Sequence, residues 1–158
     1  MSKINENKTP RGFYRIKLED GKTGKKTGDS GWLENQVTNL GVQDYLLQWL
    51  CENTASGKSV SHVALGTGGA PASNDTSLGG EVDKRTSVST SIESSRTAQF
   101  TAQFNSSNSF VTTTQDIANI GLFNTSSGGT IFAGNTYSSS SCATNQNVNV
   151  TYQIRFPA

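Results

Sequence analysis

The chain has 158 residues, of which 32% are hydrophobic and 16% are charged, and its formal net charge is +1. That length suffices for one hydrophobic core, and regularly spaced aromatic residues between Phe100 and Phe156 argue against a disordered chain. There is no run of the roughly 18 apolar residues that a membrane-spanning helix needs and no apolar segment at the N-terminus, so we expect a soluble protein that is made in the cytoplasm and contacts no membrane.

The basic residues gather near the N-terminus. Residues 1–26 contain eight lysines and arginines against three acidic residues, whereas the rest of the chain is mildly acidic. Such a segment suits an acidic partner surface, although a solvated tail and hairpin tip would have the same composition. Stacking on nucleic-acid bases is not expected, because Phe13 and Tyr14 are the only aromatics among these basic residues. We expect residues 1–12 to form an extended arm and residues 13–158 to form a single domain.

The first predicted strand covers residues 12–20, where apolar and charged side chains alternate. The glycine- and lysine-rich residues 21–28 are typical of a turn, and residues 32–37 supply a return strand, so this region is predicted to be a hairpin with a basic tip. Apolar residues then recur at spacings of three and four, which predicts one amphipathic helix over about residues 41–52.

Most of the remaining chain follows a two-residue rhythm. A short strand over residues 59–65 leads into a glycine-rich loop, and residues 138–147 are predicted to form a long loop before the last strand. Further strands are predicted over residues 86–92, 98–104, 110–114, 120–123, 130–133 and 147–156. About eight to ten short strands with one helix indicate a mainly β protein, a two-sheet antiparallel sandwich of jelly-roll type.

The last strand shows the alternation best. One side carries apolar residues and the other carries uncharged polar residues and one arginine; the two sets are Val148, Val150, Tyr152, Ile154 and Phe156, and Asn147, Asn149, Thr151, Gln153 and Arg155. One face therefore packs on a core while the other faces water. An uncharged hydrogen-bonding exterior can lie against another protein without stranding a charge, which favours a surface-building module over a catalyst.

The sequence contains few of the residues that catalytic sites use. His62 is the only histidine, and no nucleophile motif accompanies it. One histidine and two separated cysteines cannot close a zinc site. The carboxylates at Glu81 and Asp83 lie next to Lys84 and Arg85, which favours surface neutralisation over glycoside hydrolysis. We therefore predict no catalytic, cofactor-binding or metal-binding residues and no enzymatic activity.

The glycine-rich segment Gly66-Thr-Gly-Gly69 superficially resembles a phosphate-binding loop. However, no helix is predicted to begin directly after it, and no Lys-Ser/Thr follows. The glycines are better explained by a tight reversal of the chain, since glycine adopts backbone conformations that other residues avoid.

The segment Val63-Ala-Leu-Gly-Thr-Gly-Gly-Ala-Pro-Ala-Ser-Asn-Asp-Thr-Ser-Leu-Gly-Gly-Glu81 resembles one that recurs in small structural proteins of tailed bacteriophages, of the tail-fibre, head-fibre and capsid-associated kinds. Val37-Thr-Asn-Leu-Gly41 and Ile120-Gly-Leu-Phe-Asn124 are similar to flanking pieces of the same pattern. The resemblance covers much of residues 37–124. It implies a virion structural protein and brings no catalytic residues with it.

The resemblance does not say which part of the virion is involved. Together with the polar strand exteriors, it favours a capsid decoration or cement protein that binds the major capsid protein lattice on the virion exterior, as a homotrimer that repeats one small interface. The arm of residues 1–12 would then reach a neighbouring subunit. The candidate capsid contacts are the basic residues Arg11, Arg15, Lys17, Lys22, Lys25 and Lys26. The alternative is a receptor-binding tip of a head or tail fibre, which would recognise a host receptor through loops such as residues 138–147.

Overall fold

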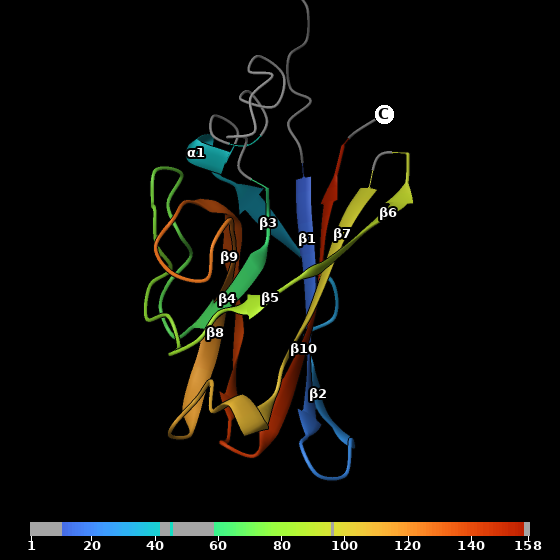
Figure 1. The fold of residues 1–158 in the computed structure, drawn as a ribbon, viewed down its shortest axis with the longest axis vertical. Helices are drawn as coiled ribbons and strands as arrows, with labels where there is room; N and C mark the ends of the chain where they lie inside the picture. The colour runs from blue at the N-terminus through green and yellow to red at the C-terminus, as the bar shows by residue number, and fades with distance from the viewer. Residues whose placement is uncertain (1–10, 42–44, 46–58, 96, 157–158) are drawn as a thin grey trace, which may run out of the picture.

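The computed structural model describes residues 11–41, 45, 59–95 and 97–156. Their strands are antiparallel neighbours in one ten-stranded sheet that nearly closes into a barrel (Figure 1). The elements are β1 (Arg11–Asp20), β2 (Lys26–Asp29), β3 (Leu33–Val37), α1 (Asn39–Gly41), β4 (His62–Gly66), β5 (Thr86–Ser87), β6 (Ser89–Ser94), β7 (Thr97–Phe104), the 3-10 turn η2 (Ser106–Asn108), β8 (Gln115–Phe123), β9 (Ile131–Cys142) and β10 (Gln146–Arg155). The prediction of a mainly β, antiparallel protein is therefore confirmed.

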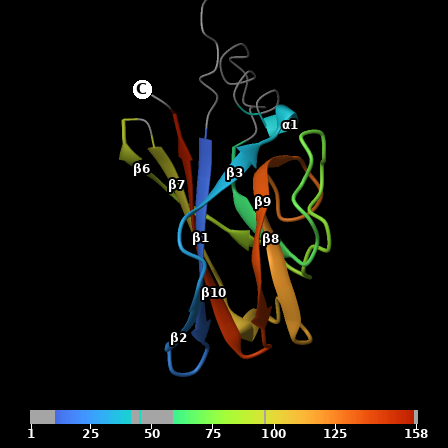
Figure 2. The ribbon, with the colours of Figure 1, turned by 180° about the vertical axis from the view of Figure 1, so that it is seen from behind.

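The strand order is β5-β4-β8-β9-β3-β1-β10-β7-β6, and β2 pairs with β1 beside this path. One half of the sheet consists of β6, β7, β10, β1 and β2, and the other of β5, β4, β8 and β9 (Figure 2). The strand β3 joins the halves, because its first residues pair with β1 and its last residues, Gln36 and Val37, pair with β9.

The opposite side of the barrel is closed by the chain itself. β5 pairs with β4 at one end of the strand order, and β6 pairs with β7 at the other end. Only Val88 separates β5 from β6, and its N–H donates to the carbonyl of Ser61 at 3.0 Å. One continuous stretch of chain therefore connects the two ends of the sheet.

The core lies between the two halves. On β10 the residues Val148, Val150, Tyr152 and Ile154 are buried, as the alternation predicted, and on β1 Tyr14, Ile16 and Leu18 face the same core. The rings of Tyr14 and Tyr152 stack with centroids 5.8 Å apart. The Tyr14 hydroxyl donates to the carbonyl of Thr136 on β9, and burial raises the pKa of Tyr14 to about 12. This hydroxyl-to-backbone bond connects the two halves inside the core.

Four local predictions are wrong. The turn predicted over residues 21–28 is shorter, because residues 26–28 belong to β2 and pair with β1. Residues 110–114 form no strand, although Phe110 and Val111 are buried, because they fill the core from the connection that precedes β8. Residues 138–147 are not a loop, since β9 runs to Cys142 and β10 starts at Gln146. Phe156 was expected in the core but lies beyond β10 with 42% of its surface exposed.

Other predictions reach beyond the described residues. Arg11 and Gly12, which we had assigned to the arm, belong to β1, and residues 1–10 lie outside the described part. Of the helix expected over residues 41–52, the structure describes Gly41 at the end of α1 and the buried Tyr45, and the rest lies outside it. The jelly-roll pattern of connections also stays a prediction.

Candidate docking surface

The outward side of β1, β10 and β7 forms a continuous polar surface, which we call the polar face. Its rows follow from the register, in which Lys17 lies opposite Asn149 and Asn149 lies opposite Gln103. Carboxamides are paired along these rows: Gln103 Nε2 donates to Asn149 Oδ1 at 2.8 Å, and Gln153 Nε2 donates to Gln99 Oε1 at 2.7 Å. The polar face comprises Arg15, Lys17, Gln99, Thr101, Gln103, Asn149 and Thr151, and beside them Gln153, which is itself buried and accepts hydrogen bonds from Arg155.

The basic tip lies at the turn between β1 and β2. Asp20 orders it, because its Oδ1 accepts hydrogen bonds from the N–H groups of Lys22 and Thr23 at 3.1 and 2.8 Å. Hydrogen bonds led by those from Thr23 lower the pKa of Asp20, so this carboxylate stays ionised. Gly24 adopts the left-handed conformation that the turn requires, with φ of 68°. Lys22 and Lys25 are therefore held on a defined turn and are exposed to solvent.

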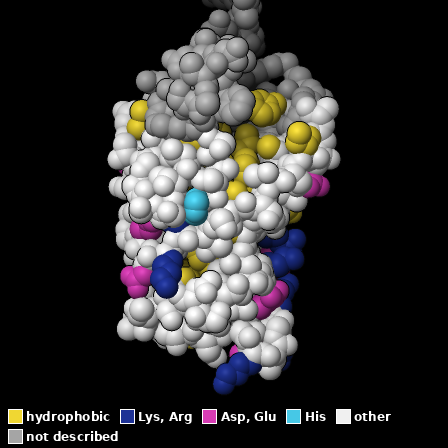
Figure 3. Space-filling view, viewed as in Figure 1, with side chains coloured by type: hydrophobic (Ala, Val, Ile, Leu, Met, Phe, Trp, Pro, Cys, Tyr) yellow, Lys and Arg dark blue, Asp and Glu magenta, His cyan; other side chains and the backbone are white. Residues whose placement is uncertain are grey.

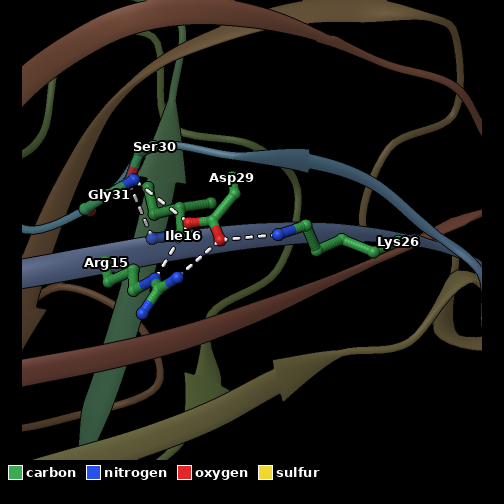
Figure 4. Close-up of polar contacts among 6 residues, drawn as sticks. All are labelled: Arg15, Ile16, Lys26, Asp29, Ser30 and Gly31. Carbon is green, nitrogen blue, oxygen red and sulfur yellow. Dashed lines mark hydrogen bonds and ion pairs between the residues drawn. The ribbon is translucent and has the colours of Figure 1, made fainter.

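Asp29 on β2 is the centre of an ion-pair network (Figure 4). Arg15 donates to both of its carboxylate oxygens, at 2.9 and 2.6 Å, and Lys26 Nζ lies 2.9 Å from Oδ2. The N–H of Gly31 adds a third donor at 3.1 Å. The hydrogen bonds from Arg15, Lys26 and Gly31 hold the pKa of Asp29 well below its ordinary value. Two of the predicted contact residues, Arg15 and Lys26, thus share one carboxylate within the chain.

The six predicted contact residues therefore divide into two sets. Arg11, Arg15 and Lys26 form ion pairs, the first of them with Glu34. Lys17, Lys22 and Lys25 form none within the described part of the chain. In the space-filling view, basic side chains lie at the lower tip, where the β1–β2 turn lies, and in separate groups higher on the right and left, while most of the visible surface is uncharged (Figure 3).

A cluster of cations and aromatic rings lies at the opposite end of β1. The guanidinium of Arg155 lies over the ring of Phe13 at 4.5 Å and at 5.8 Å from the ring of Trp32. Arg11 approaches the Phe13 ring at 5.7 Å. We call Arg11, Phe13, Trp32, Glu34 and Arg155 the arginine–aromatic patch. Sequence analysis missed the patch, and the only signal was an apolar residue, Phe13, at a position where its strand alternation expects a polar one.

A hollow of about 580 Å³ opens between β5 and the start of β6 on one side and β7 and β10 on the other. None of its lining residues is charged. Hydroxyl and carboxamide side chains dominate the lining, which consists of Thr86, Ser87, Ser89, Thr101, Ala102, Gln103, Asn105, Asn108, Asn149, Val150 and Thr151. Such a surface complements an uncharged, hydroxyl-rich ligand better than an ion.

The residues singled out for chemistry have structural partners. His62 Nδ1 lies 2.8 Å from Ser61 Oγ, and burial, followed by the charge of Arg85, lowers the pKa of His62. Arg85 forms an ion pair with Glu81 at 2.6 Å. Cys142 is buried, and burial raises the pKa of its thiol to about 11, so it is a poor nucleophile near neutral pH.

The glycine-rich loop reverses the chain, as expected. The N–H groups of Thr67 and Gly68 donate to the carbonyls of Gly80 and Gly79, both at 3.0 Å. The side-chain amide of Asn119 donates to the carbonyls of Gly69 and Gly79 at 3.0 and 2.9 Å. The N–H groups of Thr67 and Gly68 are thus occupied within the chain and are not available to a phosphate.

Within the described residues, no three histidine, cysteine, aspartate or glutamate side chains are grouped closely enough to hold a metal ion. No helix within these residues has the length and apolar character needed to cross a membrane. Comparisons with protein-family models, with curated proteins and with solved structures gave no match.

Proposed function

We propose that this chain is a non-enzymatic structural protein of a tailed-bacteriophage virion, and that it decorates and stabilises the outer capsid as a cement protein. The observation that carries the proposal is the polar face, with carboxamides paired across its strands, together with the adjoining basic tip. Lys17 on the polar face and Lys22 and Lys25 on the basic tip have no carboxylate partner within the described residues. The likeness of residues 63–81 to phage structural proteins points the same way.

The physical case rests on how such a surface meets a lattice. Uncharged amides and hydroxyls exchange water for protein partners at little cost, so the polar face can be covered without burying an unpaired charge. The free lysines steer the protein to an acidic capsid surface and set its orientation. Each contact is weak, and a homotrimer would repeat it three times on a local threefold position, which multiplies the avidity.

Capsids assembled without this chain provide the direct test. Wild-type protein should co-sediment with them, and the double variant Lys22→Glu, Lys25→Glu should bind about tenfold or more weakly, because reversed charges repel the acidic surface. Raising the salt concentration should weaken wild-type binding. Lys84→Glu is the matched control, since it reverses another exposed lysine, whose Nζ donates to the carbonyl of Asn108.

The capsid assay distinguishes failure of the proposed function from failure of the lysine contacts alone. Failure of the wild-type protein to bind such capsids contradicts the proposed function, whereas wild-type binding with an unaffected double variant removes only the role of the lysines. Sedimentation equilibrium of the unbound protein tests the trimer. Because Arg11 and Gly12 belong to β1, the arm is tested by deleting residues 1–10 rather than 1–12.

The hollow beside β7 favours a second candidate, the receptor-binding tip of a head or tail fibre. The contact between Gln103 Nε2 and Asn149 Oδ1 leaves Gln103 Oε1 and Asn149 Nδ2 as a neighbouring acceptor and donor, which suits the adjacent hydroxyls of a neutral glycan. The loop of residues 138–147, to which we first assigned recognition, is replaced by β9 and a short turn.

Staining of host cells tests this second candidate. Fluorescently labelled protein at about micromolar concentration should stain cells of the host, and Gln103→Ala with Asn149→Ala should remove the staining. Asp116→Ala is the control, because Asp116 is exposed on β8 and does not line the hollow. Absence of staining by the wild-type protein would count against an adhesin.

A further inference from the structure

Two arginines lie directly opposite each other where β1 begins and β10 ends. Arg11 and Arg155 are cross-strand partners in the antiparallel register. Like charges in this position destabilise a sheet. Glu34 relieves only one of them, through two hydrogen bonds from Arg11 at 2.7 and 2.8 Å. Arg155 has no carboxylate partner within the described residues, and its contacts there are Gln153 Oε1 and two aromatic rings.

The guanidinium of Arg155, which lacks a carboxylate partner within the described residues, lies over an aromatic ring and remains exposed to solvent. Arg155 lies over Phe13 at 4.5 Å, and Nε and Nη2 donate to Gln153 Oε1 at 3.0 and 2.5 Å. Trp32 is 44% exposed although its ring lies beside this cation. A guanidinium has five N–H donors in a planar fork, so the remaining donors are free for a carboxylate that approaches from solvent.

The composition of the patch is that of a binding hot spot. Tryptophan and arginine are the residues that most often dominate the energy of protein interfaces, where they sit among aromatic neighbours that exclude water. The patch shares the outward side of β1 with Arg15 and Lys17 of the polar face, because alternate residues of a strand point the same way. A strand of this length places the patch and the basic tip about 30 Å apart on one surface.

We infer that the arginine–aromatic patch is the principal docking point of this chain, and that its occupant is a protein surface presenting an Asp or Glu carboxylate to Arg155 with apolar side chains against Trp32. The inference rests on the proposed function only for the identity of the partner, which is then the capsid lattice. The chemistry of the partner surface is inferred from the patch itself. A carboxylate would supply the charge that Glu34 leaves uncompensated, and the aromatic surroundings would strengthen the pair by excluding water.

The capsid assay tests the patch with three variants. Trp32→Ala and Arg155→Ala should each weaken binding about tenfold or more. Arg155→Lys should also weaken it, because lysine keeps the charge but loses the planar fork and the stacking on Phe13. Ile92→Ala is the matched control: Ile92 is 85% exposed and apolar, but its register with Ala98 puts it on the other side of the sheet.

A second measurement does not depend on capsids. Poly-glutamate should shift the indole N–H signal of Trp32 in NMR spectra of the full chain, and Arg155→Gln should remove the shift. If wild-type protein binds capsids and the three variants bind equally well, the patch is not the docking point although the proposed function stands. If the wild type binds no capsid, the proposed function fails, and the poly-glutamate titration decides the patch: a shift supports it and an unmoved signal overturns it.

Discussion

The guanidinium of Arg85 ties together two loops that lie far apart in the chain. It donates to both carboxylate oxygens of Glu81 at 2.6 and 3.0 Å, and to the carbonyls of Thr125 and Gly128 at 3.0 and 2.7 Å. Its carbon lies 3.5 Å from the centroid of the Phe123 ring, and only 4% of the side chain is exposed. A cation this buried is stable because nearly every donor has a partner.

Replacing Arg85 should therefore cost more than a surface substitution. Arg85→Ala leaves Glu81 and two carbonyls without their donor, and should lower the free energy of unfolding by about 3–5 kcal/mol in urea denaturation. Arg85→Lys should cost about 1–3 kcal/mol, because one ammonium cannot reach all four acceptors. Lys84→Ala, at the neighbouring exposed position, should cost about 0.5 kcal/mol. An Arg85→Lys variant as stable as the wild type would show that the shared contacts contribute little.

Part of the cluster around Arg85 was predicted from the sequence. The pairing of Glu81 with a neighbouring basic residue was predicted as neutralisation, and the ion pair with Arg85 confirms it. Its burial was not predicted, because Phe123 and the loop around Gly128 approach Arg85 only through tertiary contacts. The same limit applies to Asn119, which reads as a polar residue of a strand but is fully buried under the glycine-rich loop.

At the scale of elements, the hairpin of β1 and β2 is stabilised by charge as well as by backbone pairing. Asp29 receives hydrogen bonds from Arg15 and Lys26, which lie on the two different strands. Its depressed folded-state pKa means that the ionised form is favoured by folding. The resulting stabilisation is complete above the ordinary aspartate pKa of about 3.9 and is lost as the pH falls from there toward the folded pKa.

The Asp29→Asn variant tests this linkage. The wild type should be more stable than the variant at pH 7. The gap should narrow as the pH falls below about 4, because the unfolded chain then binds a proton at Asp29 while the folded chain still holds it ionised. Urea midpoints at several pH values measure it. Asp116→Asn, which removes an exposed carboxylate that forms no ion pair within the described residues, should show no such gap. A gap between wild type and Asp29→Asn that is the same at pH 7 and pH 2 would contradict the assignment.

Strands were predictable where one face alone is buried. The alternation in β10 predicted which side chains enter the core, and Val148, Val150, Tyr152 and Ile154 are buried. The same alternation wrongly predicted a strand at Phe110 and Val111, which are apolar because their connection crosses the core. It also missed the second half of β9, where serines continue the strand. The patch around Arg155 was also beyond prediction, because its members come from three separate segments that register and packing bring together.

At the scale of the whole molecule, the barrel depends on a single covalent link between its two sheet ends. The chain passes from β5 to β6 through Val88, so β4 and β7, the partners of these strands, are held by the same short stretch. β1 and β10 likewise bring the two ends of the described chain together along their full length. Such pairings between distant segments typically make folding slow, on the order of milliseconds to seconds, since loops must close before contacts form.

The link at Val88 provides a test of closure. Val88→Pro removes the N–H that donates to Ser61, and should lower the free energy of unfolding by about 2–3 kcal/mol. Val88→Thr keeps the N–H and the branched shape, and should cost less than about 1 kcal/mol. In the proline variant, hydrogen exchange should accelerate in both the β4–β5 and the β6–β7 ladders, because opening at one point releases both ends of the sheet. Acceleration confined to one ladder would mean that the two halves of the sheet are stable independently and that the covalent link is not what couples them.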